Sequence, residues 1–388
     1  MFLHLLRPDR KFFGPLQALF EAAAPGRNLW VAVGPPDEGF VFPPGAVHVT
    51  RRDGLSNAIP AGAELDGVVL NGLPFSVAGA LLDGLPTVAV AWYVWGFEAY
   101  RYWDVLRARL LLPQTRRLSQ ELDHAGLGRR LLRRAASRWM RRDRETAGRL
   151  VERLDFCVTP IREEYDLFVS AGLPATTQYQ FGLVGCLDDY VDGDDAASCG
   201  DDVQLGNSAS LSNNHLDALT VLSRPGLGPR RVVVPLGYGD RRCRDAVAAF
   251  GREALGERFV PLMGFIPPDD YRAVVGSCGH VVMNHLRQQA LGNIFAALWR
   301  GARVYMNDTT AYRDLKSIGF DVRLISSDLD GPDGLRLDRP GGAEAARQRD
   351  LLREQYARDR VIDETRGILE RLSDASARKR RTRGRAER

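Results

Sequence analysis

The absence of long apolar runs sets the first limit on what this protein is. A membrane-spanning helix needs roughly 20 consecutive apolar residues, and the chain contains no such run. The opening residues, MFLHLLRPDR, have no basic n-region and only a short apolar stretch. They predict a first β-strand rather than a signal peptide.

Cysteine is scarce and its spacing is uninformative. The five cysteines form no CxxC pair, and none has a histidine partner at zinc spacing. They are typical of reduced thiols in a cytosolic protein, and we expect no structural zinc. They are Cys157, Cys186, Cys199, Cys243 and Cys278.

The common nucleotide-binding and nucleic-acid-binding signatures are also missing. The second half of the chain contains neither GxGxxG nor GxxxxGK[ST], which argues against a dinucleotide dehydrogenase and a P-loop NTPase. No helix-turn-helix, RRM or zinc pattern accompanies the basic residues. We see no internal repeat.

Alternating strand and helix patterns are present throughout. Over 388 residues, 45% of them hydrophobic and 26% charged, short apolar runs alternate with helical patterns, which is typical of parallel sheets covered on both faces. We predict an α/β fold of two Rossmann-like doubly wound domains. The expected strands are 2–6, 29–33, 67–71, 87–92 and 156–159, and then 203–206, 231–239, 258–262, 280–283 and 303–306.

The alternation also predicts the domain boundaries. An aspartate-rich segment, residues 188–202, interrupts it and holds seven aspartates. We expect an N-terminal acceptor-side domain and a C-terminal ligand-binding domain, joined by an acidic linker and followed by a closing helix and a disordered basic tail. The N-terminal domain spans residues 1–185, the linker 186–202 and the C-terminal domain 203–350. The closing helix spans 351–373 and the tail 374–388.

Basic residues are unevenly distributed. Between Arg101 and Arg153 there are fifteen arginines against six acids, and residues 378–388 hold seven basic residues against one acid. Such runs are often plain solvated surface. They also suit an anionic partner, either a membrane leaflet or nucleic acid. Leu131, Leu132 and Trp139 are interleaved with arginines, which favours a membrane surface over nucleic acid. The alternative for these three residues is a place in the core.

Three polar turns follow predicted strands in the second half. In an open parallel sheet, ligands bind beyond the carboxyl ends of the strands, where helix N-termini favour phosphate. We expect helices to begin near Ser212 and near Arg287. The first turn comprises Gly206, Asn207 and Ser208 and is followed by Ser212 and Asn213. The second comprises Gly237, Tyr238 and Gly239. The third comprises Asn284, Arg287, Gln288 and Gln289.

These residue types suit a nucleotide bearing a sugar. Arg287 can bind phosphate oxygens through two N–H groups, and Gln288 and Gln289 can serve sugar hydroxyls or a base edge. Gly292, next to Asn293, suits a close approach to the helix backbone. Each residue also has a plainer interpretation: Ser212 and Asn213 as N-caps, the glycines as turn residues, and Arg287 as the partner of an acid.

Several stretches resemble glycosyltransferase family 56. They are LGNSASLSNNHLDAL, VVVPLGYG, RQQALGNIFAALWRGARVYMN and, in the first half, WYVWGFEAYRYWDVLRARLLLPQTRR. The resemblance runs from about residue 88 to 330. It implies a GT-B enzyme, a hexosyltransferase, that moves 4-acetamido-4,6-dideoxygalactose from a TDP-sugar to a polyprenyl-diphosphate-linked glycan. It also implies a cytoplasmic enzyme on the inner face of the cell membrane.

The resemblance completes the expected site. We assign the leaving diphosphate to Arg287 and the turn at Gly206, and the catalytic base to Glu98, which matches an acid of the family. The alternative for Glu98 is an ion pair with Arg101 or Arg107. Trp95 and Arg107 are the acceptor-side candidates. The DxD at Asp192-Gly193-Asp194 lies in the linker, and we expect neither a metal nor a cofactor.

Two other functions stay open. One is a different GT-B enzyme that acts on a soluble acceptor or on the nucleotide sugar itself. The other is a non-enzymatic nucleic-acid-binding protein that uses the arginine-rich faces. Our interpretation is a transferase with a nucleotide-sugar donor, a polyprenyl-linked acceptor, an anionic membrane surface as partner and no nucleic acid.

Overall fold

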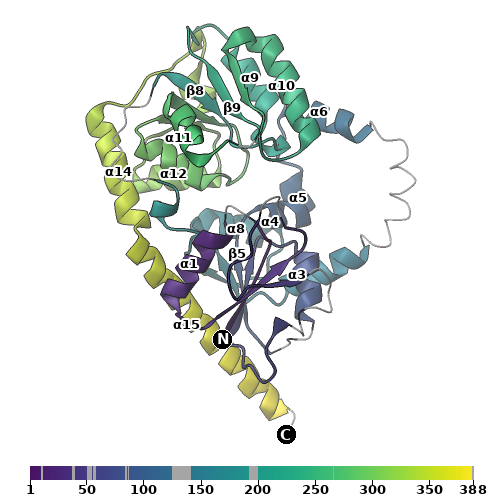
Figure 1. The fold of residues 1–388 in the computed structure, drawn as a ribbon. Coiled ribbons are helices and arrows are strands. Elements are labelled where there is room, and N and C mark those ends of the chain that lie inside the picture. The colour runs from purple at the N-terminus through teal and green to yellow at the C-terminus, as the bar shows by residue number, and fades with distance from the viewer. Residues whose placement is uncertain are drawn as a thin grey trace. The chain divides into compact units, whose positions relative to one another are not determined.

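A computed structural model of the chain divides into two compact units (Figure 1). Unit 1 comprises Met1–Arg107, Arg129–Asp189 and Tyr356–Arg388, and unit 2 comprises Ala108–Gly128 and Tyr190–Gln355. The structure describes residues 1–9, 12–36, 40–49, 55, 58–83, 85, 87–124, 141–191, 200–264 and 266–386.

Unit 1 is built on a seven-stranded parallel sheet in the order β3-β2-β1-β4-β5-β6-β7. All five predicted strands are present. The sequence missed β3 and β7, which are three-residue edge strands with exposed positions and no apolar run. The strands are β1 (Phe2–Leu6), β2 (Asn28–Val33), β3 (Val47–Val49), β4 (Gly67–Asn71), β5 (Val90–Tyr93), β6 (Phe156–Val158) and β7 (Gln178–Gln180).

Helices cover both faces of this sheet. Tyr93 packs in a buried cluster with α1 (Phe13–Ala23) and α15 (Arg358–Ala386). The neighbouring Trp92 points to the opposite face, where its ring lies 4.9 Å from Phe75 and 5.2 Å from Phe168. These phenylalanines belong to α3 (Phe75–Leu82) and α8 (Arg162–Ala171), and unit 1 also contains α4 (Phe97–Tyr102), α5 (Asp104–Arg107) and the 3₁₀ turn η1 (Leu187–Asp189).

Unit 2 contains a six-stranded parallel sheet in the order β10-β9-β8-β11-β12-β13. The five predicted strands are confirmed, and β13 is short and only partly buried. The strands are β8 (Asp202–Leu205), β9 (Val232–Pro235), β10 (Phe259–Leu262), β11 (Cys278–Met283), β12 (Arg303–Met306) and β13 (Val322–Leu324), with a small hairpin of β14 (Asp330–Gly331) and β15 (Gly334–Leu335).

Two helices of unit 2, α9 and α10, pack with β8 and β9 in one buried cluster. Buried leucines of α9 and valines of the strands form its centre. The helical elements are α6 (Pro113–His124), η2 (Leu211–Asn213), α9 (His215–Leu222), α10 (Arg241–Leu255), η3 (Gly256–Arg258), α11 (Pro268–Gly276), α12 (Leu291–Trp299), α13 (Thr310–Ile318), η4 (Ile325–Leu329) and α14 (Gly342–Tyr356).

The predicted basic tail is the end of a long helix. We expected residues 374–388 to be disordered, whereas α15 continues to Ala386 and belongs to unit 1. Leu372 packs so closely on Gly67 that a Cβ there would lie 2.3 Å from its Cγ. The Ala89 N–H donates to Ser376 Oγ at 2.9 Å. Packing against the sheet therefore orders a segment whose composition alone is typical of disorder.

The predicted domain boundaries also differ from the units. Residues 108–128 lie in unit 2, because Asp217 on α9 caps the start of α6. Its carboxylate accepts hydrogen bonds from the Gln114 and Thr115 N–H groups, each at 2.9 Å. Aspartates near both ends of the predicted linker have ion-pair partners: Asp188 lies 3.0 Å from Arg358 and Asp202 lies 2.7 Å from Arg231. The linker's centre, residues 192–199, lies outside the described residues.

Candidate functional site

The polar turns of unit 2 lie at the point where the strand order of its sheet reverses. β8 is flanked by β9 on one side and β11 on the other, so the chain leaves β8 and β11 in opposite directions. Ligands of open α/β sheets bind at such a switch point. We call residues 206–214 the β8 loop and residues 284–290 the β11 loop.

Asn213 sets the shape of the β8 loop. Its Oδ1 accepts from the Asn207 N–H at 3.0 Å, and its Nδ2 donates to the Ser208 carbonyl at 3.0 Å. His285 Nε2 lies 2.9 Å from the same Oδ1. Because an amide oxygen only accepts, the histidine must donate, so its Nε2 carries the hydrogen. Asn213 is fully buried and serves the loop rather than capping a helix.

A reciprocal pair of asparagines joins the two loops. Asn214 Nδ2 donates to the Asn284 carbonyl at 3.1 Å, and Asn284 Nδ2 donates to the Asn214 carbonyl at 3.0 Å. Asn307, which follows β12, donates to Asn284 Oδ1 at 2.8 Å. The carboxyl ends of three strands are thereby held by side-chain amides, with both partners of each bond buried or half-buried.

Side chains of the predicted turns also contact one another directly. Ser212 Oγ donates to Gln289 Oε1 at 2.8 Å, and Gln289 Nε2 donates to Asn207 Oδ1 at 3.3 Å. The Gly237–Gly239 turn joins them through its backbone, since the Ala209 N–H donates to the Tyr238 carbonyl at 2.6 Å. The structure thus brings together the three turns that the sequence singled out.

A pocket of about 410 Å³ opens beside two of these turns. At its edge, Asp240 Oδ1 accepts from the Arg242 and Cys243 N–H groups and caps α10. The Arg242 guanidinium donates to the Leu122 carbonyl at 2.9 Å. The pocket is lined by Ser119, Leu122, Ala209, Ser210, Leu211, Gly239, Asp240 and Arg242.

Arg287 lies in the β11 loop, not at the start of a helix. We expected a helix to begin near this residue, but α12 begins at Leu291 after a left-handed Ala290. The Arg287 guanidinium donates to the Gln288 carbonyl at 2.8 Å. The helix near Ser212 likewise starts later, at His215. In both cases the polar loop continues because its side chains bond within the network instead of capping a helix.

Two glycines fit the network for steric reasons. Gly206 has φ +67°, and a Cβ there would lie 2.6 Å from Asn213 Oδ1. At Gly292 a Cβ would lie 2.4 Å from the Tyr190 ring, so this aromatic side chain makes the close approach that we had expected from a ligand. Gln288 and Asn293 are half-buried, and neither side chain has a hydrogen bond to a described residue.

Two buried histidines in the network are neutral. Burial lowers the pKa of His215 to about 3. For His285, burial is again the main cause, with Arg287 and His215 adding to it, and its pKa is also about 3. Neither ring nitrogen of His215 has a hydrogen-bond partner among the described residues. Two buried, neutral imidazoles therefore belong to the network, and a Cβ at Gly206 would lie 2.8 Å from His215 Nε2.

The acceptor-side candidates belong to unit 1. Glu98 is 1% exposed, and its Oε1 accepts from the Trp92 indole at 2.7 Å and the Trp95 N–H at 2.8 Å. Arg107 pairs with Asp104 at 2.6 Å. Trp95 packs against Phe12, with ring centroids 4.7 Å apart.

Within the described residues, no cluster of three or more His, Cys, Asp or Glu could hold a metal ion. The DxD at Asp192 lies outside them, as do Leu131, Leu132 and Trp139. Among the described residues, no helix is long and apolar enough to cross a membrane. Four of the cysteines are buried and form no disulfide with a described residue: Cys157, Cys186, Cys243 and Cys278.

Sequence reasoning missed several members of the network. Asn214 sits at φ 49°, and its Oδ1 accepts from the Leu112 N–H at 2.8 Å. The run Asn213-Asn214-His215 was a usable signal, because consecutive amides suit left-handed positions and turns. Nothing in the sequence indicates that Asn307 or Leu112 would meet it.

The fold matches solved structures, although no family model and no curated protein matches the chain. Sucrose-phosphate synthase from Thermosynechococcus elongatus aligns with TM-score 0.61 at 12% identity, over 97% of this chain and 100% of that one. Anabaena Alr3699/HepE, solved with UDP and glucose, aligns with TM-score 0.58 at 12% identity, over 96% and 99%.

The N-terminal domain of Candida albicans trehalose-6-phosphate phosphatase aligns with TM-score 0.62 at 9% identity, over 97% and 99%. At such identities the likeness establishes the fold alone. The chain has the GT-B fold, with a Rossmann-like sheet in each unit, as the sequence predicted. Membership of glycosyltransferase family 56 stays a prediction.

Proposed function

We propose that this protein is a glycosyltransferase that takes a hexosyl group from a nucleotide sugar held by unit 2. The interlocked β8 and β11 loops carry the proposal, because they fix polar groups and an arginine at the switch point of a doubly wound sheet. The GT-B fold and the UDP in the HepE structure support it.

In this proposal, Arg287 and the backbone of the Gly206–Ser208 turn bind the diphosphate of the donor. An arginine gives charge-assisted hydrogen bonds to phosphate oxygens, and these stabilise the departing diphosphate as its charge grows. Gln288 and Asn293, whose amides have no hydrogen bond to a described residue, are assigned to sugar hydroxyls. No cofactor or metal is needed in this scheme.

Glu98 is the proposed base for the acceptor hydroxyl, with Trp95 and Arg107 on the acceptor side. A base must reach the proton that it removes, through a free carboxylate oxygen or one water. In this structure Glu98 Oε1 is bound to the Trp92 and Trp95 N–H groups. The Glu98→Gln substitution tests this assignment.

The finer assignment follows the resemblance of the sequence to glycosyltransferase family 56. We propose a TDP-linked deoxyhexose donor, 4-acetamido-4,6-dideoxygalactose as its sugar, and a polyprenyl-diphosphate-linked glycan as acceptor. The enzyme would then act on the cytoplasmic face of the membrane, as a peripheral protein. The arginine-rich segments supply positive charge for that surface.

A transfer assay tests the proposed activity. Purified protein is incubated with a panel of TDP- and UDP-linked hexoses and a polyprenyl-diphosphate disaccharide, and glycolipid product is detected by mass spectrometry. We expect product only with a TDP-sugar and a lipid-linked acceptor. Transfer to a soluble glycan alone would favour the other GT-B interpretation. Tight nucleotide-sugar binding with conversion of the sugar and no acceptor requirement would indicate an epimerase.

A further inference from the structure

A pocket lies directly beside the turn to which the diphosphate is assigned. It is the cavity of about 410 Å³ next to the β8 loop, and its volume is within the range of small-molecule sites. We call it the α6 pocket, because α6 forms one of its walls. The other walls are residues 209–211 of the β8 loop and, after β9, Gly239, Asp240 and Arg242.

The α6 pocket lies on the β9 side of the switch point. In the sheet, β8 stands between β9 and β11. The pocket is lined by residues that follow β8 and β9, and none of the described residues of the β11 loop lines it. Arg287, Gln288 and Asn293, by contrast, follow β11. The Gly206–Ser208 turn therefore has the pocket on one side and the proposed sugar-binding residues on the other.

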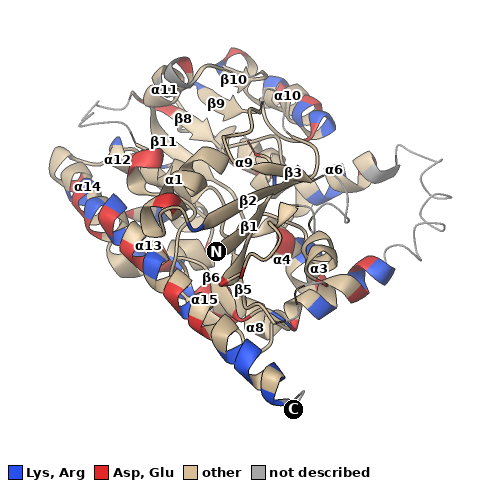
Figure 2. Ribbon diagram, turned by 60° about the horizontal axis from the view of Figure 1, so that its bottom comes forward, with Lys and Arg blue, Asp and Glu red and all other residues tan. Residues whose placement is uncertain are grey.

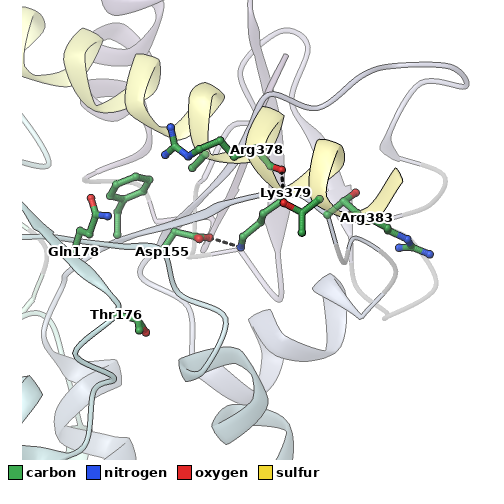
Figure 3. A pocket seen from close by; sticks show the side chains of 10 residues that line it. Asp155, Thr176, Gln178, Arg378, Lys379 and Arg383 are labelled. Atoms are coloured by element: carbon green, nitrogen blue, oxygen red, sulfur yellow. Dashed lines mark hydrogen bonds and ion pairs between the residues drawn. The ribbon is translucent and has the colours of Figure 1, made fainter. Parts of the chain in front are cut away.

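This pocket is at the sheet edge where open α/β sheets bind ligands, and a cavity in unit 1 shows the contrast. That cavity, of about 610 Å³, lies at the amino ends of strands (Figure 3). There Lys379 of α15 reaches Asp155, with 2.7 Å between Nζ and Oδ2. On the next residue, Arg380 pairs with Glu64 at 3.1 Å. These ion pairs fasten α15 to the sheet, so they serve the fold.

The wall formed by α6 is held in place at both ends. Near its start, Asp217 Oδ2 accepts from the Thr115 N–H at 2.9 Å and from the Thr115 hydroxyl at 2.7 Å. Near its end, the Leu122 carbonyl accepts from the Arg242 guanidinium at 2.9 Å. The helix is therefore fixed to unit 2 beside the loops, and a preformed wall lowers the ordering cost of binding.

The other two walls are joined through their backbones. The Asp240 N–H donates to the Ala209 carbonyl at 2.8 Å, and the Ala209 N–H donates to the Tyr238 carbonyl at 2.6 Å. Gly239 has φ +121°, and a Cβ there would lie 2.4 Å from the Ala209 carbonyl oxygen. A glycine is therefore required where the β8 loop and the β9 turn meet in the wall.

The charges at the α6 pocket are balanced. Arg242 Nε lies 4.0 Å from Asp240 Oδ1, and Figure 2 shows basic and acidic residues together along α10. Asp240 Oδ1 also accepts from the Arg242 and Cys243 N–H groups at the start of α10. A phosphate at this helix N-terminus would meet a carboxylate that already uses these donors. The pocket therefore suits an uncharged ligand.

The rest of the lining combines apolar surface with hydroxyl groups. Leu122, Ala209 and Leu211 supply the apolar surface, and Ser119 and Ser210 supply the hydroxyls. A nucleoside has matching chemistry, because its planar base has apolar faces. The edges of the base carry carbonyl and N–H groups, and the pentose carries hydroxyl groups, all of which can pair with hydroxyl side chains.

We propose that the α6 pocket binds the nucleoside end of the sugar-nucleotide donor. The proposal rests on the proposed function, which places the diphosphate at the Gly206–Ser208 turn and the sugar at Gln288 and Asn293. In such a donor the diphosphate joins the nucleoside to the sugar. The nucleoside therefore extends from the turn past Ala209 into the pocket, and α6 takes part in donor recognition.

Titration calorimetry with TDP and with inorganic pyrophosphate separates nucleoside contacts from diphosphate contacts. Ser119→Phe fills the pocket from α6, and we expect it to lose at least about tenfold in TDP affinity while its pyrophosphate affinity is unchanged. Gln120→Phe is the matched control, because it places the same ring on the next, exposed residue of α6 outside the pocket. It should keep both affinities within about twofold.

A second variant removes a contact without adding volume. Leu122→Ala takes away apolar surface and leaves the backbone carbonyl that accepts from Arg242. It should weaken TDP binding by about fivefold, with no effect on pyrophosphate binding and with an unchanged circular dichroism spectrum.

Four results would overturn the proposal. Equal losses for TDP and pyrophosphate in Ser119→Phe, or unchanged TDP affinity in both pocket variants, would reject the nucleoside subsite alone. Equal affinity of the wild type for the two probes would do the same. If Ser119→Phe binds TDP normally but TDP-glucose more weakly than the wild type does, the pocket holds the sugar. If the wild type binds neither TDP nor pyrophosphate, the donor site itself is wrong and the subsite fails with it.

Discussion

Asn213 and His285 are hydrogen-bonded at 2.9 Å, joining the loop after β8 to the loop after β11. Both side chains are buried, and the same Asn213 oxygen accepts the Asn207 N–H. One amide therefore sets the conformation of the β8 loop and its distance from the β11 loop. The proposed donor site depends on this contact, since Arg287 follows His285 by two residues.

Asn213→Ala should destabilise the protein as well as the site. The change leaves the His285 Nε2–H and the Asn207 N–H without their acceptor in a buried region, which costs about 2–4 kcal/mol in the free energy of unfolding. Urea denaturation measures it. Asn293→Ala is the control, because Asn293 has no side-chain hydrogen bond to a described residue, and it should change stability by less than about 0.5 kcal/mol. Similar losses in both variants would contradict the network's role.

The buried histidines predict a loss of stability on acidification. Folding lowers the pKa of His215 from 6.5 to about 3. Between these values the unfolded chain binds the proton more strongly, so stability is full above about pH 6.5 and falls as the pH drops toward 3. At about pH 5 one such histidine costs roughly 2 kcal/mol.

His215→Leu removes this titration while keeping an apolar side chain of similar size. Thermal melts of the wild type and of this variant, from neutral pH down to about pH 5, measure the difference. We expect a flatter pH dependence in the variant. Parallel curves for the two proteins would show that His215 titrates at its ordinary pKa.

Glu98→Gln separates a proton-transfer role from a positioning role. The amide oxygen can still accept from the Trp92 indole and the Trp95 N–H, so the fold should be retained. If Glu98 is the base, kcat falls by about 100-fold or more and the acidic limb of the pH–rate profile disappears. If it only holds Trp95, the profile keeps its shape, and the base is another group.

Transfer should not require a metal. The proposed site offers Arg287 and loop N–H groups for the diphosphate, which can stabilise its charge directly. We expect full turnover in EDTA. If activity is lost in EDTA and restored by Mg²⁺ or Mn²⁺, the diphosphate is held by a metal, and the aspartates around Asp192 become its first candidates.

The sheets were predictable and the side-chain network was only partly so. Strands such as β1 and β9 are continuous apolar runs, because both faces are covered, and that pattern is visible in the sequence. The turns that end β8, β9 and β11 were predicted from their polar residues, and they do meet. The residues at which the helices after these turns begin were not predicted, because Asn213 and Gln289 form hydrogen bonds across the switch point rather than along the chain.

Other features depend on contacts between distant segments. The C-terminal segment is polar and basic, yet it is helical, because Leu372 packs on Gly67 and Ser376 accepts the Ala89 N–H. Residues 108–128 belong to unit 2 because Asp217 caps α6. Neither contact has a local signal, so the sequence predicted disorder for the C-terminal segment and the wrong domain for residues 108–128.

Nucleoside diphosphate binding tests the central claim most directly. Isothermal titration with TDP and UDP compares the wild type with Arg287→Ala and with Arg252→Ala, an exposed arginine of α10 that serves as the charge-matched control. We predict binding to the wild type, with TDP preferred, a loss of at least about tenfold for Arg287→Ala, and no change for Arg252→Ala. No binding of either nucleotide to the wild type, or equal affinity in all three proteins, would contradict a donor site at the β8 and β11 loops.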